Sequence, residues 1–272
     1  MAASLDTFEL GISAGARLLV SDLSLSLPAG SLVAMLGQNG VGKTLTLHAL
    51  AGLRAPASGE VRIGGTDIRR LGLRERARRL GLLLQQQDDP FPTTALETAL
   101  MGRHAHLGIW QWETGEDQAL ARTALAAMGL AGMEGRFCAT LSGGERRRVG
   151  IAALLVQDPG IWLLDEPLNH LDPCHQLLVL ETLSQLAASG RTVIASLHDP
   201  VLAMRHFHSA LLLHGDGRWQ FGPVATLLDA ATLAALYGVD FAAYQGPGGT
   251  VMLPAPRAGS RTPALTAGGP GR

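Results

Sequence analysis

The sequence predicts an α/β fold in which a parallel sheet carries a smaller antiparallel subdomain and a helical subdomain. Short apolar runs without alternation are typical of strands buried on both faces. Such runs recur at residues 31–36, 80–84, 161–165, 192–196 and 210–214. A glycine-rich stretch follows the first run and precedes a helix-like segment. This order of strand, loop and helix is how a parallel α/β unit begins.

Antiparallel strands are predicted at the amino-terminal end. Residues 7–12 and 18–27 alternate apolar and polar side chains, and Ala14-Gly15 supplies a turn between them. After the glycine-rich stretch, residues 45–53 favour a helix. The next segment predicts a strand at EVRIGG (60–65) and a basic helix over 68–79.

The chain is expected to form one domain with an insertion and a tail. Ala/Leu-rich helical periodicity from about residue 88 to 158 predicts a helical subdomain inside a domain spanning 1–244. Residues 245–272 are rich in Pro, Gly and Ala, which favours a disordered tail.

Composition excludes several classes of protein. The 22 Lys and Arg residues balance 23 Asp and Glu residues, so no basic surplus points to nucleic-acid binding. Two cysteines without CxxC spacing exclude a disulfide framework and a cysteine zinc site, and they fit a reducing compartment. We expect no signal peptide. We also expect no transmembrane helix, since the best apolar run, 151–164, is broken by the residues Gln157, Asp158, Pro159 and Gly160.

The stretch GQNGVGKT (37–44) fits the phosphate-binding pattern G-x-x-x-x-G-K-[ST] in full. Its glycines Gly37, Gly40 and Gly42 let the backbone turn consecutive N–H groups toward phosphate oxygens. Lys43 provides a cation for the β- and γ-phosphates, and Thr44 a hydroxyl for Mg²⁺. The alternative interpretation is a glycine-rich turn that happens to contain a lysine.

Two carboxylates follow the apolar strand in IWLLDEP (161–167). Ligands gather at the carboxyl ends of parallel strands, so Asp165 is placed to hold the Mg²⁺ shell and Glu166 to polarise a water. A carboxylate pair after a strand is also common in structural turns, and this motif gains its meaning from the phosphate loop.

A second anion site is predicted at LSGGE (141–145). Ser142, Gly143 and Gly144 would begin a helix, whose N-terminal end attracts negative charge. One γ-phosphate does not need two such sites within one chain. Two chains arranged head to tail would use both.

Together these motifs resemble the ATP-binding subunit of ABC transporters, over residues 5 to about 244. GQNGVGKT resembles the Walker A loop, LSGGE the ABC signature and IWLLDE the Walker B strand. Gln85 falls at the Q-loop glutamine and His198 at the switch histidine, while residues 169–172 match the D-loop. The resemblance implies a P-loop NTPase fold with a RecA-like core.

The resemblance also implies a role for each site residue. ATP and Mg²⁺ would be held in a sandwich dimer of two identical chains, with Glu166 as general base, His198 at the γ-phosphate, and Gln85 joining metal and water to the helical subdomain. Mg²⁺ would be held by Thr44, Gln85 and Asp165. The implied ATP contacts are Gly37, Gln38, Asn39, Gly40, Val41, Gly42, Lys43 and Thr44 of one chain, with Ser142, Gly143, Gly144 and Asp172 contributed across the dimer interface.

Segments 82–108, 168–176 and 227–241 resemble importers for iron–siderophore, haem and cobalamin, and the triple glutamine before Pro-Phe leans towards the vitamin B12 branch. This resemblance implies an ATPase that powers import through an integral membrane permease dimer, with a substrate-binding protein involved indirectly. The subunit would lie at the cytoplasmic face of the inner cell membrane. The alternative is a soluble ABC ATPase acting on nucleic acid or ribosomes. Translation factors of this superfamily normally carry two cassettes and this chain shows one, while the 99 residues between Lys43 and Ser142 leave no room for the long insertions of DNA-repair members.

Three features depart from the family pattern or invite another interpretation. The position where the family places an aromatic on adenine is near Ala14, and Arg17 is the expected partial replacement. The histidine groups allow a metal-site hypothesis, but we expect structural or solvated histidines. The basic run allows a nucleic-acid hypothesis, but we expect it to support the dimer interface and phosphate. The histidines are His104, His106, His170, His175, His206 and His208, and the basic run is Arg146, Arg147 and Arg148.

Overall fold

The computed structural model describes residues 4–84, 92–108, 110–246 and 249–255. Its centre is a six-stranded sheet with the order β10-β9-β3-β8-β7-β6, parallel throughout except for the antiparallel edge strand β10. The parallel sheet predicted from the apolar runs is therefore confirmed. Its strands are β3 (Leu32–Leu36), β6 (Leu80–Leu83), β7 (Ile161–Leu164), β8 (Thr192–Ser196), β9 (Ser209–Leu213) and β10 (Trp219–Pro223).

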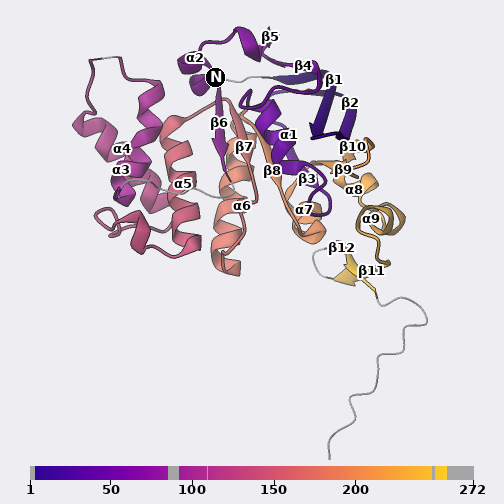
Figure 1. Cartoon of the computed structure of the whole chain (residues 1–272). Coiled ribbons are helices and arrows are strands. Elements are labelled where there is room, and N and C mark those ends of the chain that lie inside the picture. Colours follow the sequence, from indigo (N-terminus) through magenta and orange to yellow (C-terminus); the bar gives the residue numbers. More distant parts are fainter. Residues whose placement is uncertain (1–3, 85–91, 109, 247–248, 256–272) are drawn as a thin grey trace, which may run out of the picture.

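A four-stranded sheet with the order β2-β1-β4-β5 lies to one side of the central sheet (Figure 1). The predicted amino-terminal hairpin is present, with Ala14 paired to Arg17 at its turn. Helix α1 (Lys43–Leu50) lies between the two sheets, and apolar side chains from both close one core around Leu47. The strands are β1 (Leu5–Ala14), β2 (Arg17–Leu27), β4 (Ser58–Ile63) and β5 (Thr66–Asp67).

Helices cover the other face of the central sheet, and α3, α4 and α5 among them form the predicted helical subdomain (Figure 1). Capping boxes start α3, α4 and α5, in which Thr94, Thr114 and Ser142 each accept a hydrogen bond from the backbone three residues later. Helix α6 connects β7 to β8 in the sequence and packs on the central sheet. The elements are α3 (Ala95–Leu100), the 3₁₀ turns η2 (Met101–Ala105) and η3 (Cys138–Thr140), α4 (Gly115–Ala127), α5 (Gly143–Gln157), α6 (Pro173–Ala188) and α7 (Pro200–His206).

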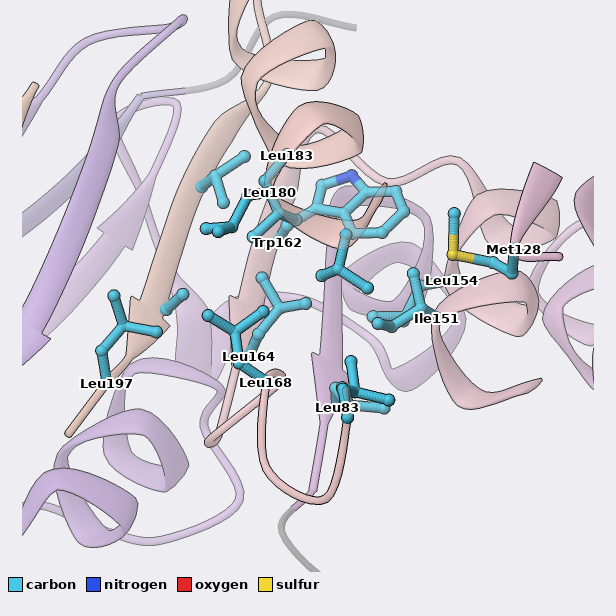
Figure 2. Close-up of a cluster of buried hydrophobic side chains, with 14 of the residues drawn as sticks. Leu83, Met128, Ile151, Leu154, Trp162, Leu164, Leu168, Leu180, Leu183 and Leu197 are labelled. Atoms are coloured by element: carbon cyan, nitrogen blue, oxygen red, sulfur yellow. The ribbon is translucent and has the colours of Figure 1, made fainter. Parts of the chain in front are cut away.

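Trp162 of β7 is the centre of the core on this helical side (Figure 2). Its side chain is fully buried, and its indole N–H donates to the carbonyl of Pro159 at 3.0 Å, so the buried donor is satisfied. Leucines from α5 and α6 pack around it, Leu154 on one side and Leu180 and Leu183 on the other. This packing fixes β7, and with it the carboxylates at its end, between two helices.

Two expectations need correction. The basic helix over 68–79 is broken into η1 (Ile68–Arg70) and α2 (Leu73–Arg79), because Leu71 is extended and buried and Gly72 is an extended N-cap. Residues 245–246 and 249–254, expected to lie in a disordered tail, are strand residues. They belong to a hairpin of β11 (Phe241–Gly246) and β12 (Gly249–Pro254), whose Phe241 and Met252 pack on the main core. Residues 256–272 lie outside the described residues.

Two helices before this hairpin, α8 (Val224–Leu227) and α9 (Ala230–Tyr237), complete the chain's described carboxyl-terminal part (Figure 1). None of the helices in the described ranges has the length and apolar character needed to cross a bilayer.

Candidate functional site

The predicted phosphate loop connects β3 to α1, and its backbone needs glycine at three positions. Gly37, Gly40 and Gly42 have φ values of 152°, 80° and 104°, which side-chain-bearing residues rarely adopt. At Gly37 an added Cβ would also lie 2.4 Å from the carbonyl oxygen of Leu213. The loop is therefore a built backbone curve at the end of β3, with Gln38, Asn39 and Gly40 exposed at its tip.

Lys43 lies inside this curve. Its Nζ donates to the carbonyl oxygens of Gly37 at 2.7 Å and Gln38 at 3.1 Å, and the residue is only 6% exposed. Burial lowers the pKa of the Lys43 ammonium, and the carboxylates of Glu166 and Asp165 oppose that shift. The Lys43 ammonium therefore lies close enough to both carboxylates to feel their charge.

A chain of hydrogen bonds links the loop to the strand ends of β7 and β8. The hydroxyl of Thr44 donates to Oδ2 of Asp165 at 2.6 Å, and the Ser196 hydroxyl donates to Oδ1 of the same carboxylate at 2.7 Å. The Ser196 oxygen accepts in turn from the backbone N–H of Glu166 at 2.8 Å. Ser196 was not predicted as a site residue, although it ends the apolar run TVIAS whose strand was predicted.

Glu166 has a left-handed backbone, with φ of 51°, and its carboxylate is held at both oxygens. Oε1 lies 2.7 Å from Nε2 of His198, and Oε2 accepts from the side-chain amide of Asn169. The structure therefore brings Glu166 and His198 together. Asn169 was noted only as part of the D-loop.

The basic run at the start of α5 does not serve the role expected for it. Arg146 donates to the Leu141 carbonyl at 2.7 Å, and Arg148 is buried and donates to the Met128 carbonyl at 2.7 Å. Arg147 donates to the backbone carbonyls of Asp165 and Glu166, each at 2.9 Å. All three guanidinium groups thus bond backbone carbonyls of their own chain, because α5 packs closely on the subdomain and on β7. For Arg147 and Arg148, which are directed into their own chain, this corrects the expectation that they contact a phosphate or a second chain.

The signature residues lie at the surface end of α5. Ser142 and Gly143 are exposed, and Ser142 is the N-cap of the helix. Gly144 is buried against the backbone of His170, where an added Cβ would lie 2.7 Å from the carbonyl oxygen. Signature and D-loop of one chain are therefore adjacent, and glycine is required for that contact.

Asp172 is the N-cap of α6. Its Oδ1 accepts from the backbone N–H of His175 at 2.9 Å, and its Oδ2 lies 2.8 Å from His175 Nδ1. These hydrogen bonds hold the pKa of the Asp172 carboxyl below its usual value. Gln85, the expected Q-loop glutamine, lies outside the described residues.

The carboxyl-terminal helix α9 also reaches the phosphate loop, which the sequence did not reveal. The Gln38 amide donates to the Leu236 carbonyl at 3.1 Å, and the Tyr237 hydroxyl donates to the His198 carbonyl at 3.5 Å. Burial, with the nearby Asp199 carboxylate, raises the pKa of Tyr237 to about 12.

The expected adenine region lies beside the same loop. Ala14 is exposed at the end of β1, and Arg17 donates to the Gly215 carbonyl at 2.8 Å. Gly215 packs on Val41, since an added Cβ there would lie 2.9 Å from the Val41 Cα. Arg17 is thus held by Gly215, the residue that packs on Val41 of the phosphate loop.

His104 and His106 have partners close by in the fold. Nε2 of His106 lies 2.8 Å from the Gln157 carbonyl oxygen, and His104 lies 3.4 Å from Glu113. Burial lowers the pKa of His206. Within the described ranges, no three His, Cys, Asp or Glu side chains are grouped to hold a metal ion. The Thr44 hydroxyl and the Asp165 carboxylate do fit Mg²⁺, which takes oxygen ligands and needs few of them from protein when it also binds substrate phosphates.

Comparison with known proteins matches residues 20–169 to the family described as ABC transporter. The chain is 36% identical over 264 residues to the hemin import ATP-binding protein HmuV of Myxococcus xanthus, covering 94% of this chain and 98% of the relative. It is 34% identical over 232 residues to the ferric enterobactin transport ATP-binding protein FepC of Escherichia coli, covering 85% and 86%. A solved inward-facing structure of a metal-chelate type ABC transporter superposes with a TM-score of 0.81 at 28% identity, covering 94% and 98% of the two chains.

Proposed function

This chain belongs to the ABC transporter family as an ATP-binding subunit whose ATPase activity is coupled to transport, and we propose that it powers import of an iron chelate or haem through a separate membrane permease. The observation that carries the proposal is the hydrogen-bonded chain from Thr44 through Asp165 and Ser196 to Glu166. It joins a phosphate loop to a carboxylate that can act on water.

The phosphates of ATP would lie in the curve of residues 37–44. The N–H groups of the glycine-rich backbone and the first turn of α1 are donors for phosphate oxygens, and the Lys43 ammonium adds a positive charge. Thr44 and Asp165, with Gln85, are the residues that would hold Mg²⁺. The ion would neutralise charge on the β- and γ-phosphates.

Glu166 is the proposed general base for the attacking water. Its carboxylate is 2.7 Å from His198, and that contact and the Asn169 amide fix its direction. General-base catalysis contributes roughly 10²–10⁴-fold, and phosphoryl transfer otherwise depends on positioning and charge neutralisation. His198 would keep the carboxylate aimed and contact the γ-phosphate.

The proposed working unit is a dimer of two copies of this chain on a permease dimer at the cytoplasmic face of the membrane. Ser142 and Gly143 are exposed at the N-terminal end of α5, where the helix dipole and free N–H groups favour a phosphate. We assign that phosphate to ATP held by Lys43 of the second copy. Asp172 is exposed and follows His170, whose backbone contacts Gly144 of the signature, so it would lie at the same interface.

The cargo proposed is an iron chelate or haem, since the relatives compared above carry hemin and ferric enterobactin in their names and the solved structure is of metal-chelate type. The lean towards cobalamin rests on the glutamine run and Pro-Phe, and residues 85–91 lie outside the described residues. Neither of the two relatives is named for cobalamin.

An uptake assay tests the proposal. Cells lacking this chain are supplied with haem, a ferric siderophore or cobalamin, each labelled, and complemented with wild type or Glu166→Gln. We expect wild type, and not Glu166→Gln, to restore uptake of haem or the siderophore. Restoration of cobalamin uptake alone would overturn the iron assignment, and restoration of none of them would overturn the importer proposal.

A further inference from the structure

Arg147 joins the signature helix to the ends of two strands of the central sheet. Its Nη1 donates to the carbonyl of Leu84, directly after β6, and its Nη2 donates to the carbonyls of Asp165 and Glu166, directly after β7. One guanidinium group therefore bonds three carbonyls at the ends of two neighbouring strands. Arg147 itself lies in the second turn of α5.

These carbonyls lie where the strand ladder stops. The parallel pairing of β6 with β7 ends at Leu83 and Leu164, and one further bond runs from the Asp165 N–H to the Leu83 carbonyl at 2.9 Å. Beyond that point, the guanidinium group of Arg147 bonds the strand-end carbonyls in place of further backbone hydrogen bonds between the two strands. A guanidinium group is planar and carries several N–H donors in a fixed arrangement, so it can bond more than one carbonyl at once. A lysine ammonium group cannot reproduce that arrangement of donors.

The same bonds fix the backbone of Glu166 from both sides. Its N–H donates to the Ser196 hydroxyl at 2.8 Å, and its carbonyl accepts from Arg147 at 2.9 Å. Between them the residue holds a φ of 51°, a conformation that costs free energy outside glycine and persists when surrounding contacts enforce it. That conformation sets the direction in which the Glu166 side chain leaves the backbone, and its Oε1 lies 2.7 Å from Nε2 of His198.

We infer that Arg147 is a positioning residue for Glu166, holding the peptide that aims the carboxylate without touching ATP or water itself. The inference deepens the proposed function and rests on it, because it takes Glu166 as the general base. Helix α5 would then have two roles, because it carries both Ser142 of the signature and Arg147. Ser142 and Arg147 are five residues apart on one helix, about 7.5 Å along its axis, so the end facing the second copy is rigidly joined to the base of its own chain.

Arg148 provides a matched control at the next position of the same helix. It is 5% exposed, and its guanidinium bonds the carbonyls of Met128 and Gly129 in the helical subdomain, at 2.7 and 3.2 Å. It is therefore a buried arginine that caps backbone carbonyls, as Arg147 does, but at a place away from Glu166.

The experiment compares Arg147→Met, Arg147→Lys and Arg148→Met in the full chain, with kcat, KM, affinity for an ATP analogue and Tm measured for each. We expect Arg147→Met to lower kcat by about tenfold or more while the analogue affinity changes by less than about twofold, because misplacing a catalytic group slows chemistry without removing phosphate contacts. Arg147→Lys should recover part of the loss. Arg148→Met should lower Tm to a similar degree and leave kcat within about twofold of wild type.

A double-mutant cycle separates positioning from general packing. Single-turnover hydrolysis is measured for Glu166→Gln with and without Arg147→Met, and we expect no further slowing, since the group that Arg147 aims is already lost. An equal loss of kcat in Arg148→Met, or the full Arg147→Met effect persisting beside Glu166→Gln, would overturn the inference. If Arg147→Met does not fold, Arg147→Lys and Arg147→Gln take its place in the same comparisons. Wild-type turnover by Glu166→Gln alone would instead show that the proposed base is wrong.

Discussion

The hydroxyl of Thr44 donates a 2.6 Å hydrogen bond to Asp165, which lies 121 residues further along the chain. The first turn of α1 and the end of β7 are thereby joined at one point, next to the buried ammonium of Lys43. The Thr44 hydroxyl oxygen and the negatively charged Asp165 carboxylate meet there. That arrangement is the reason for placing the Mg²⁺ of the nucleotide at this contact.

Thr44→Val should therefore raise the Mg²⁺ concentration needed for ATP turnover by about tenfold or more, because a ligand hydroxyl is replaced by a methyl group. Thr46→Val is the matched control. Thr46 is fully buried two residues later in the same helix, and within the described structure its hydroxyl has no hydrogen-bond partner. The measurement is ATPase rate against Mg²⁺ concentration, and equal shifts in both variants would count against the assignment of Thr44.

Lys43→Ala should abolish both ATP binding and turnover. Lys43 is the cation inside the loop curve, bonded to the Gly37 and Gln38 carbonyls, and its loss leaves the phosphates without a direct positive charge. Equilibrium binding of a fluorescent ATP analogue with Mg²⁺ checks this. A variant that binds as tightly as wild type would show that residues 37–44 are not the phosphate site.

The parts of the site that the sequence predicts are those encoded within a few residues. The glycines of the loop, Lys43 and the carboxylate pair are read from contiguous motifs and the strand that precedes them. Ser196 escapes that kind of analysis, because its role is a contact with Asp165, 31 residues away, and a serine at a strand end has no pattern of its own. Tyr237 escapes it for the same reason, since α9 meets His198 only in the folded chain.

The errors have equally local causes. Composition suggested a disordered segment from residue 245, but a few apolar side chains, among them Met252, decide whether such a segment packs on the core. The charge of Arg147 and Arg148 suggested an external anion, whereas burial turned both groups toward carbonyls. Net charge along a sequence does not tell which way a side chain faces.

The cap of α6 predicts a pH dependence of stability. Hydrogen bonds from His175 hold the pKa of Asp172 below its usual value, so the folded state favours the ionised carboxyl. Its contribution is complete above the ordinary carboxyl pKa of about 4 and is lost as the pH falls through the lower folded-state value. Asp172→Ala should lower Tm by a few degrees at pH 7, and that difference should shrink in acid.

Asp172→Ser is the control for this experiment, because serine can still cap the helix but does not titrate. It should keep most of the Tm at pH 7 and show a flatter dependence on pH. Thermal unfolding followed by circular dichroism between pH 3 and pH 7 gives both curves. A loss of stability in Asp172→Ala that stays constant down to pH 3 would rule out the ionised cap as its cause.

The exposed Ala14 predicts weak discrimination between ATP and GTP. Without an aromatic ring beside the base, binding depends on the phosphates, and Arg17 is already held by the Gly215 carbonyl. Ala14→Tyr should tighten ATP binding by about fivefold, the equivalent of roughly 1 kcal/mol from stacking. Ser13→Tyr is the control, since neighbouring side chains on a strand point to opposite faces. Equal affinities for all three proteins would remove Ala14 from the adenine site.

Glu166→Gln joins the chemistry to assembly. The substitution removes the proposed base but keeps the shape of the side chain and leaves the Thr44–Asp165 contact in place. Hydrolysis should fall by about 10²-fold or more, while ATP stays bound. Because each nucleotide would contact Lys43 of one copy and Ser142 of the other, the trapped ATP should hold two chains together. Sedimentation with and without Mg-ATP measures this dimer.

Ser142→Arg added to Glu166→Gln tests where the second copy binds. Ser142 is exposed at the N-cap of α5, so a long cation there fills the place of the γ-phosphate contact without disturbing the core. We expect the ATP-dependent dimer to be lost while each monomer still binds ATP at its own loop. Arg146→Glu is the control, because Arg146 is exposed one turn further along the same helix. Arg146→Glu, added to Glu166→Gln in the same way, changes the charge near the signature without blocking the N-terminal end of α5, so the ATP-dependent dimer should persist. A double variant that still dimerises with Mg-ATP would mean that the γ-phosphate is not capped by Ser142, and a dimer lost equally in the Arg146 control would point to charge alone.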